Sequence, residues 1–137
     1  MTTPFSHQLR IYWEDTDAGG VVFYANYLKY FERARTEWLR ARGFEQEALR
    51  STARVVLVVT EARLSYRRPA RLDDELRVTV DRCDVGRASL EITQVAWRGD
   101  ERLVEGDIRI GCVDADTFKP RRLPGDLLER IAAVPRG

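Results

Sequence analysis

The sequence has few of the residues from which most enzyme sites are built. It contains one histidine, His7, and two cysteines, Cys83 and Cys112, which are far apart and in no spacing typical of metal ligands. We therefore expect no metal site, and a Ser-His-Asp or Cys-His triad would have to use His7. We interpret both cysteines as small buried residues in a protein of a reducing compartment.

Long apolar runs and an excess of one charge are also missing. The longest apolar run, VVLVV at 55–59, is much shorter than a membrane-spanning helix. Lys and Arg total 23 and Asp and Glu total 22, so no charge excess points to nucleic acid or to an anionic membrane. The N-terminal residues, MTTPFSHQLRIYW, lack the apolar core of a signal peptide. We expect a cytoplasmic protein that binds no nucleic acid and inserts into no membrane.

Helical periodicity begins at Asn26. The spacing of apolar residues predicts one amphipathic helix of about 16 residues, with Asn26 as its N-cap and Gly43 just beyond its end. The face expected to be buried carries Tyr27, Tyr30, Phe31, Ala34, Trp38 and Ala41, and the opposite face carries Lys29, Glu32, Arg33, Arg35, Thr36, Glu37 and Arg40. A helix face this rich in aromatic residues suggests that the rest of the protein surrounds the helix. A second helical piece is predicted at 44–50.

Most of the remaining chain has the patterns of strands. Alternation predicts a strand over 8–13, with Leu9, Ile11 and Trp13 on one face. Further strands are predicted at 55–70, 76–82, 88–97 and 102–113, and a terminal helix at 125–134. We therefore expect one α+β domain, residues 1–137, in which an antiparallel sheet curls round the long helix. The open edges of such a sheet are usually paired in an oligomer.

Three carboxylates, Glu14, Asp15 and Asp17, precede a glycine pair and an apolar run in EDTDAGGVV at 14–22. An acidic residue in such a loop often serves only to form a turn. That role would explain one of the three carboxylates but not all of them. A DxD metal site, as in nucleotide-sugar transferases or haloacid dehalogenase phosphatases, needs acidic ligands downstream, where the chain offers only 73–75 and scattered acids. A glycosidase carboxylate pair needs a sugar cleft, for which the chain has little room.

A single carboxylate acting on an activated acyl group explains the whole stretch. Asp17 would be the nucleophile or the general base, and the glycine pair, with Gly20, would let backbone amides approach a substrate oxygen. The N–H groups at the start of the following helix, near Tyr24, would stabilise the developing oxyanion. Because a lone carboxylate is a weak catalyst, the electrophile should be reactive, such as a thioester. This chemistry needs no cofactor and no metal.

The segment EDTDAGGVVFYANYLKYFERARTEWLR, residues 14–40, resembles the signature of the 4-hydroxybenzoyl-CoA thioesterase family of hotdog-fold proteins. It is most similar to the branch called Tol–Pal-associated acyl-CoA thioesterase. LSYRRPARLDDELRV (64–78) and VDADTFKPRRLP (113–124) extend the resemblance over nearly the whole chain. The resemblance implies a hotdog fold, hydrolysis of acyl-CoA substrates, and homodimers joined edge to edge or homotetramers, with an active site between subunits.

The resemblance also implies residue roles. The family's catalytic Asp falls on Asp17, and its helix-start amide, which polarises the thioester carbonyl, falls on Tyr24. Arg87 and Ser89 fall where the family binds the nucleotide end of CoA. Other candidate phosphate partners are Arg67, Arg68, Arg121 and Arg122.

The side chain at position 24 leaves the acyl group open. The Tol–Pal-associated branch commonly has a His there, whereas the hydroxybenzoyl-type enzymes have an aromatic pair that resembles Phe23-Tyr24. The rival hypothesis is a non-catalytic hotdog protein that binds acyl-CoA or serves as an envelope-associated scaffold, and such a protein would have no need for the acid at Asp17.

Overall fold

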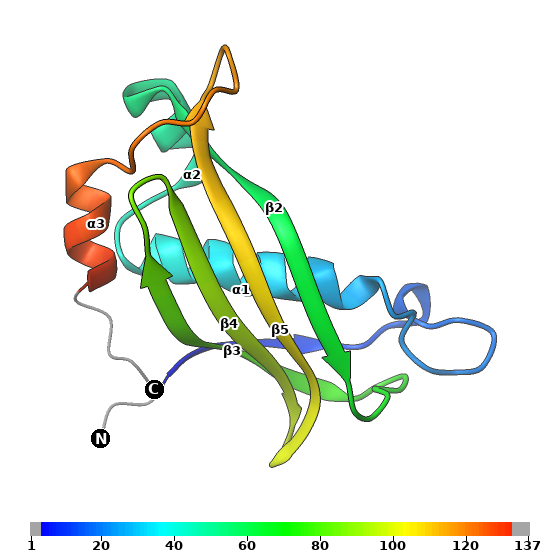
Figure 1. Cartoon of the computed structure of the whole chain (residues 1–137). Coiled ribbons are helices and arrows are strands. Elements are labelled where there is room, and N and C mark those ends of the chain that lie inside the picture. The colour runs from blue at the N-terminus through cyan, green and yellow to red at the C-terminus, as the bar shows by residue number, and fades with distance from the viewer. Residues whose placement is uncertain (1–3, 133–137) are drawn as a thin grey trace.

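The computed structural model describes residues 4–132 and consists of one sheet crossed by one long helix (Figure 1). The elements, in chain order, are β1 (Phe5–Arg10), a 3-10 turn (Trp13–Asp15), α1 (Asn26–Ala41), α2 (Gln46–Ala48) with a π-helical turn (Leu49–Ala53), β2 (Val55–Tyr66), β3 (Glu75–Val85), β4 (Ser89–Arg98), β5 (Glu101–Asp114) and α3 (Gly125–Ala132). The strands pair antiparallel in the order β1-β3-β4-β5-β2. The predicted α+β architecture is confirmed; residues 133–134 of the predicted terminal helix lie outside the described residues.

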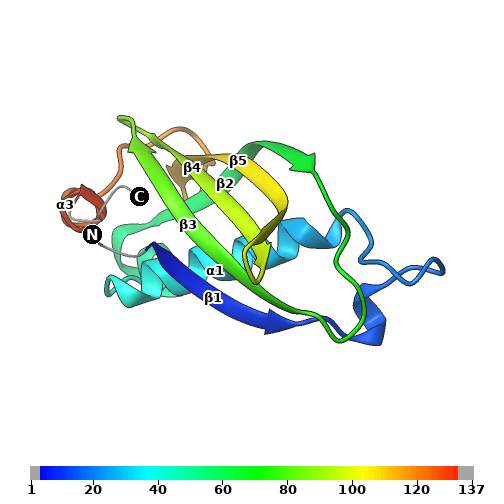
Figure 2. The ribbon, with the colours of Figure 1, turned by 90° about the horizontal axis from the view of Figure 1, so that it is seen from below.

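Helix α1 runs across one face of the sheet, which bends round it (Figure 2). Its end is closed as predicted: Gly43 has a φ of +87° and donates to the Arg40 carbonyl, and Phe44 donates to the Leu39 carbonyl. The predicted N-cap is wrong. Ala25 is the N-cap, and the Asn26 side chain instead donates to the Asp15 carbonyl at 2.8 Å, which ties the helix to the preceding loop. Within residues 4–132, no helix has the length and apolarity needed to span a membrane.

One buried residue of α1 was not expected from periodicity. Arg35 is only 7% exposed, although its spacing predicts the solvent face. Its Nη1 donates to Oε1 of Gln94 at 3.1 Å, and Nε2 of Gln94 donates to the Phe31 carbonyl at 3.0 Å. Burial lowers the pKa of Arg35 to about 10. Ala41, predicted to be buried, is exposed.

Strand β1 is shifted towards the N-terminus relative to the prediction. Ile11 is buried, but the chain leaves the sheet before Trp13, which lies in the 3-10 turn and is 77% exposed. The reason is local: Asp15 N–H donates to the Tyr12 carbonyl and Tyr12 N–H donates to the Asp15 carboxylate, which closes a tight turn. Cys83 and Cys112 are both buried, as predicted.

Gly106 lets the helix approach the sheet. The ring of Phe31, which is fully buried on α1, packs directly over Gly106 of β5. A Cβ at this glycine would lie 2.6 Å from Cε2 of Phe31, which is closer than real contacts allow. Helix α1 can therefore lie this close to β5 only because residue 106 is a glycine.

We predict that Gly106→Ala lowers the free energy of unfolding by about 2 kcal/mol, because the buried Phe31 ring has to move. Gly111→Ala is a matched control on the same strand, since its Cβ would meet only Cγ2 of Thr60, at 3.3 Å. Urea unfolding of both variants measures the difference. Equal losses for the two variants would show that the contact with Phe31 does not limit the packing.

Candidate functional site

The acid-rich stretch forms a small β-hairpin that precedes α1. Asp17 N–H donates to the Val21 carbonyl, Gly20 N–H donates to the Asp17 carbonyl, and Thr16 bridges to Val22. Gly20 has a φ of +79°, a left-handed conformation that glycine adopts without a steric penalty. The glycine is needed for this turn; its predicted contact with substrate stays a prediction, and its own N–H is occupied within the turn.

Asp15 holds the loop together. Its carboxylate accepts a hydrogen bond from Tyr12 N–H at 2.8 Å, and its carbonyl accepts hydrogen bonds from Phe23 N–H at 3.0 Å and the Asn26 side chain. Burial raises the pKa of Tyr30, and the neighbouring Asp15 carboxylate raises it further. Both the carboxylate and the backbone carbonyl of Asp15 therefore stabilise the loop.

Asp17 lies on the exposed part of the hairpin. One carboxylate oxygen, Oδ1, accepts a hydrogen bond from Gly19 N–H at 2.8 Å, which fixes the side chain relative to the turn. Within residues 4–132, no ion pair involves Asp17, and no three acids, histidines or cysteines come together as a metal site would require. The arrangement presents a charged carboxylate, held at one oxygen, to the surroundings of the hairpin.

The start of α1 offers backbone donors beside this hairpin. In the described part of the chain, no hydrogen bond uses the N–H groups of Tyr24 or Ala25. The Tyr24 side chain is 64% exposed and contacts the rings of Phe23 and Tyr66. Unpaired N–H groups at a helix N-terminus carry the positive end of the helix dipole and bind anionic oxygens. The N–H of Tyr24 is therefore available to an external acceptor at the helix start.

A segment after β2 clamps the hairpin and the helix start. Val22 N–H donates to the Ala70 carbonyl at 2.9 Å, and Ala70 N–H donates to the Tyr27 hydroxyl at 3.1 Å. The Tyr66 hydroxyl donates to the Tyr24 carbonyl at 3.0 Å. A cavity of about 270 Å³ lies here, lined by Val22, Tyr24, Tyr27, Tyr66, Arg67, Arg68 and Pro69. Its walls are aromatic, with two arginines among them.

Arg87 and Ser89 lie at the other end of the sheet. Arg87 lies in the turn between β3 and β4, and Ser89, the first residue of β4, pairs with Gly111 of β5. Tyr66, beside Tyr24, pairs with Val104 of the same strand. Seven residues of β5 thus separate the two ends, about 23 Å in an extended strand. The structure brings Asp17 and Tyr24 to one end and places Arg87 and Ser89 of the same chain at the opposite end.

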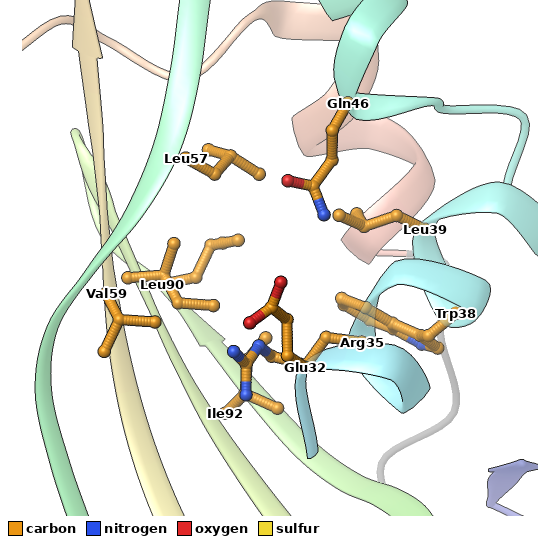
Figure 3. Close-up of a pocket in the computed structure, with 10 residues that line it drawn as sticks. Glu32, Arg35, Trp38, Leu39, Gln46, Leu57, Val59, Leu90 and Ile92 are labelled. Carbon is orange, nitrogen blue, oxygen red and sulfur yellow. The ribbon is translucent and has the colours of Figure 1, made fainter. Parts of the chain in front are cut away.

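A second cavity, of about 180 Å³, lies between α1 and the sheet near the Arg87 end (Figure 3). Glu32 and Arg35 of α1 and Gln46 are directed into this space, opposite the side chains of β2 and β4. Its apolar lining is Trp38, Leu39, Leu57, Val59, Leu90, Ile92 and Ile110. This cavity combines an apolar wall with three polar groups and opens beside the edge strand β2.

The arginines considered as phosphate partners differ in whether they already form ion pairs within the chain. Arg67 pairs with Glu105 and Arg68 with Glu101. Arg121 pairs with Asp114, whose pKa is lowered to about 2 mainly by hydrogen bonds from the N–H groups of Thr117 and Asp116. Within residues 4–132, no ion pair engages Arg87 or Arg122. These two guanidinium groups are the ones left to meet an external anion.

A helix cradled by a five-stranded antiparallel sheet, with an acid-bearing hairpin at the helix N-terminus, is the hotdog architecture. The chain belongs to the thioesterase-like superfamily, whose family model matches residues 11–131.

Individual relatives agree with this assignment. The chain is 42% identical over 128 residues to the acyl-CoA thioester hydrolase YbgC of Escherichia coli O6:H1, covering 93% of this chain and 95% of the relative. A probable thioesterase from Bartonella henselae superposes with a TM-score of 0.84 at 34% identity, covering 89% of this chain and all of that one. The 1,4-dihydroxy-2-naphthoyl-CoA thioesterase of Synechocystis, with a TM-score of 0.87 at 20% identity, covers 96% and 97% of the two chains and supports the fold alone.

We predict that Asp15→Ala lowers the free energy of unfolding by about 1 kcal/mol, because it removes the acceptor that caps the 3-10 turn. Glu14→Ala, an exposed change beside it, should alter stability by less than about 0.5 kcal/mol. Thermal unfolding of both variants provides the comparison. An Asp15→Ala protein as stable as the Glu14→Ala protein would remove Asp15 from its structural role.

Proposed function

We propose that this chain hydrolyses acyl-CoA thioesters to the free carboxylic acid and CoA. The observation that carries the proposal is the placement of Asp17 on a hairpin clamped beside the unpaired N–H groups of Tyr24 and Ala25. A carboxylate and oxyanion donors in one site suit acyl transfer from a reactive ester. The thioesterase activities named for relatives such as YbgC support the same reaction.

Two routes use these groups and consume one water. In the first, Asp17 attacks the thioester carbonyl, CoA leaves as the thiolate, and water hydrolyses the resulting anhydride. In the second, Asp17 removes a proton from water as the water attacks the carbonyl, and the tetrahedral intermediate then expels CoA as the thiolate, which takes up the proton. In both routes the carbonyl oxygen becomes negative, and the N–H groups of Tyr24 and its neighbour stabilise that charge. Both routes need an ionised carboxylate at position 17.

We predict that Asp17→Asn lowers kcat by about 1,000-fold or more, equivalent to about 4 kcal/mol of transition-state stabilisation. The amide keeps the shape and the acceptor oxygen of the acid, so the hairpin should remain folded and acyl-CoA should still bind. It lacks the charge and basicity that either route requires. Thiol release from a panel of acyl-CoA substrates measures kcat, and the same assay on wild type identifies the preferred acyl group.

Asp15→Asn is the matched control, since it is the same change two residues away on a carboxylate engaged in the fold. It should keep activity within about tenfold, because the amide oxygen still accepts the Tyr12 N–H. An Asp17→Asn protein with more than a tenth of wild-type kcat would move the chemistry to another residue. Wild-type protein that binds acyl-CoA without releasing thiol would favour the non-catalytic hotdog alternative.

We propose further that the active unit is a homodimer or homotetramer. β2 is a 12-residue edge strand whose described partner is β5 alone, and long open edges invite pairing. Antiparallel pairing of two β2 strands would set the Tyr66 end of one chain against the Val55 end of its copy. Asp17 of one subunit would then meet the Arg87 end of the other, which accounts for the separation within one chain.

The paired arrangement also gives the substrate a path. Arg87 and Ser89 of one subunit would bind the nucleotide end of CoA while Asp17 and Tyr24 of the other act on the thioester. The cavity beside Leu57 opens at the β2 edge, and its apolar wall suits an acyl group. Within the superfamily we place the chain nearest the Tol–Pal-associated branch, on the resemblance of its segment 14–40; the acyl group is left to the substrate panel.

We predict that mixed subunits restore activity. Asp17→Asn and Arg87→Glu chains should each be poorly active alone, the second through a raised KM. After joint refolding, a two-fold dimer with one altered chain of each kind has one intact site, so about a quarter of wild-type activity should return. Light scattering should give the mass of two or four chains. A mixture no more active than its parents, or an active monomer, would overturn the shared site.

A further inference from the structure

Tyr66 makes the contact at the site that the sequence patterns did not single out. It is the last residue of β2, and its hydroxyl donates to the Tyr24 carbonyl at 3.0 Å. That carbonyl shares its peptide unit with the N–H of Ala25, the N-cap of α1. The hydrogen bond therefore fixes the plane of the peptide that follows Tyr24, directly at the proposed oxyanion donors.

The ring of Tyr66 is itself held. It meets Tyr24 edge-on at 6.3 Å between centroids and Tyr27 at 5.7 Å. Ala70 N–H in turn donates to the Tyr27 hydroxyl, so the two rings form a fixed wall at the helix start. Burial raises the pKa of the Tyr66 hydroxyl, with Tyr24 adding to the effect, which keeps the hydroxyl a donor at neutral pH. The Tyr66 hydroxyl therefore adds a further constraint to a turn that Asn26 N–H already closes on the Phe23 carbonyl.

We propose that Tyr66 is a positioning residue for the thioesterase reaction, which orients the Tyr24–Ala25 peptide so that its N–H, that of Ala25, faces the substrate oxygen beside the N–H of Tyr24. This inference rests on the proposed function. Accepting a hydrogen bond at the carbonyl also polarises the peptide and strengthens the N–H at its other end. Because an oxyanion donor acts only when it is aimed at the developing charge, the loss should appear in kcat more than in KM.

Tyr66→Phe tests this role, because it removes the hydroxyl and keeps the ring contacts. We expect kcat to fall about tenfold while KM stays within about twofold, since displacement of a catalytic donor costs rate rather than binding. Thr79→Val is the matched control. The Thr79 hydroxyl also donates to a backbone carbonyl, that of Val95 at 3.3 Å, but inside the sheet. Its loss should lower the melting temperature and leave kcat unchanged.

A spectroscopic measurement distinguishes a local change at the Tyr24 peptide from a general loss of stability of the protein. In protein with 13C-labelled tyrosine carbonyls, the Tyr24 signal should shift in Tyr66→Phe and stay in place in Thr79→Val. Tyr66→Phe with kcat within twofold of wild type, or with an unshifted Tyr24 carbonyl, would overturn the inference. Wild-type protein that releases no thiol from any acyl-CoA would instead overturn the proposed function, which distinguishes the two failures.

Discussion

The contact between Phe31 and Gly106 sets the distance on which the site depends. α1 is a single rigid element, so the height at which its middle rests on β5 also fixes the height of its first turn. The segment 66–71 comes from the end of β2, the neighbour of β5, and reaches the helix start through Val22, Tyr24 and Tyr27. A larger side chain under Phe31 would move the helix away from β5. The helix start would then no longer fit the hydrogen bonds that the segment 66–71 makes with it.

The acid-rich loop divides its work between neighbouring carboxylates. Asp15 is used at both its carboxylate and its carbonyl to join β1, the hairpin and the helix start. Asp17 makes a single side-chain contact, to Gly19 N–H, and otherwise faces outward. A free carboxylate can be held precisely only if other groups hold its loop. The crowding of acids in the sequence therefore places an architectural carboxylate, Asp15, beside the carboxylate that we propose acts on the substrate, Asp17.

The sequence predicts the elements that depend on the periodicity of apolar residues and on turn-forming residues such as glycine. The helix Asn26–Ala41, its stop at Gly43 and the succession of strands along the chain follow from spacing and turn residues, whereas the order of the strands within the sheet was not predicted. It mispredicts positions that depend on particular hydrogen bonds, either to a residue far along the chain or within a tight local turn. Arg35 is buried because Gln94, 59 residues away, offers an acceptor, and Trp13 leaves the sheet because Asp15 closes a turn. Tyr66 has the same pattern as any aromatic residue at a strand end, and only the fold brings it to Tyr24.

The backbone donor that we propose at position 24 has a consequence for how the protein can diversify. The Tyr24 peptide is fixed by its neighbours, while its side chain is largely exposed and fills no core position. Exchange of that side chain for another aromatic residue alters the wall of the neighbouring cavity, keeps a ring against Tyr66 and leaves the Tyr66 hydrogen bond to the Tyr24 carbonyl in place. Under the proposed mechanism, substrate preference and catalytic competence are separable by mutation, and a change of one codon can alter what the pocket accepts without passing through an inactive intermediate.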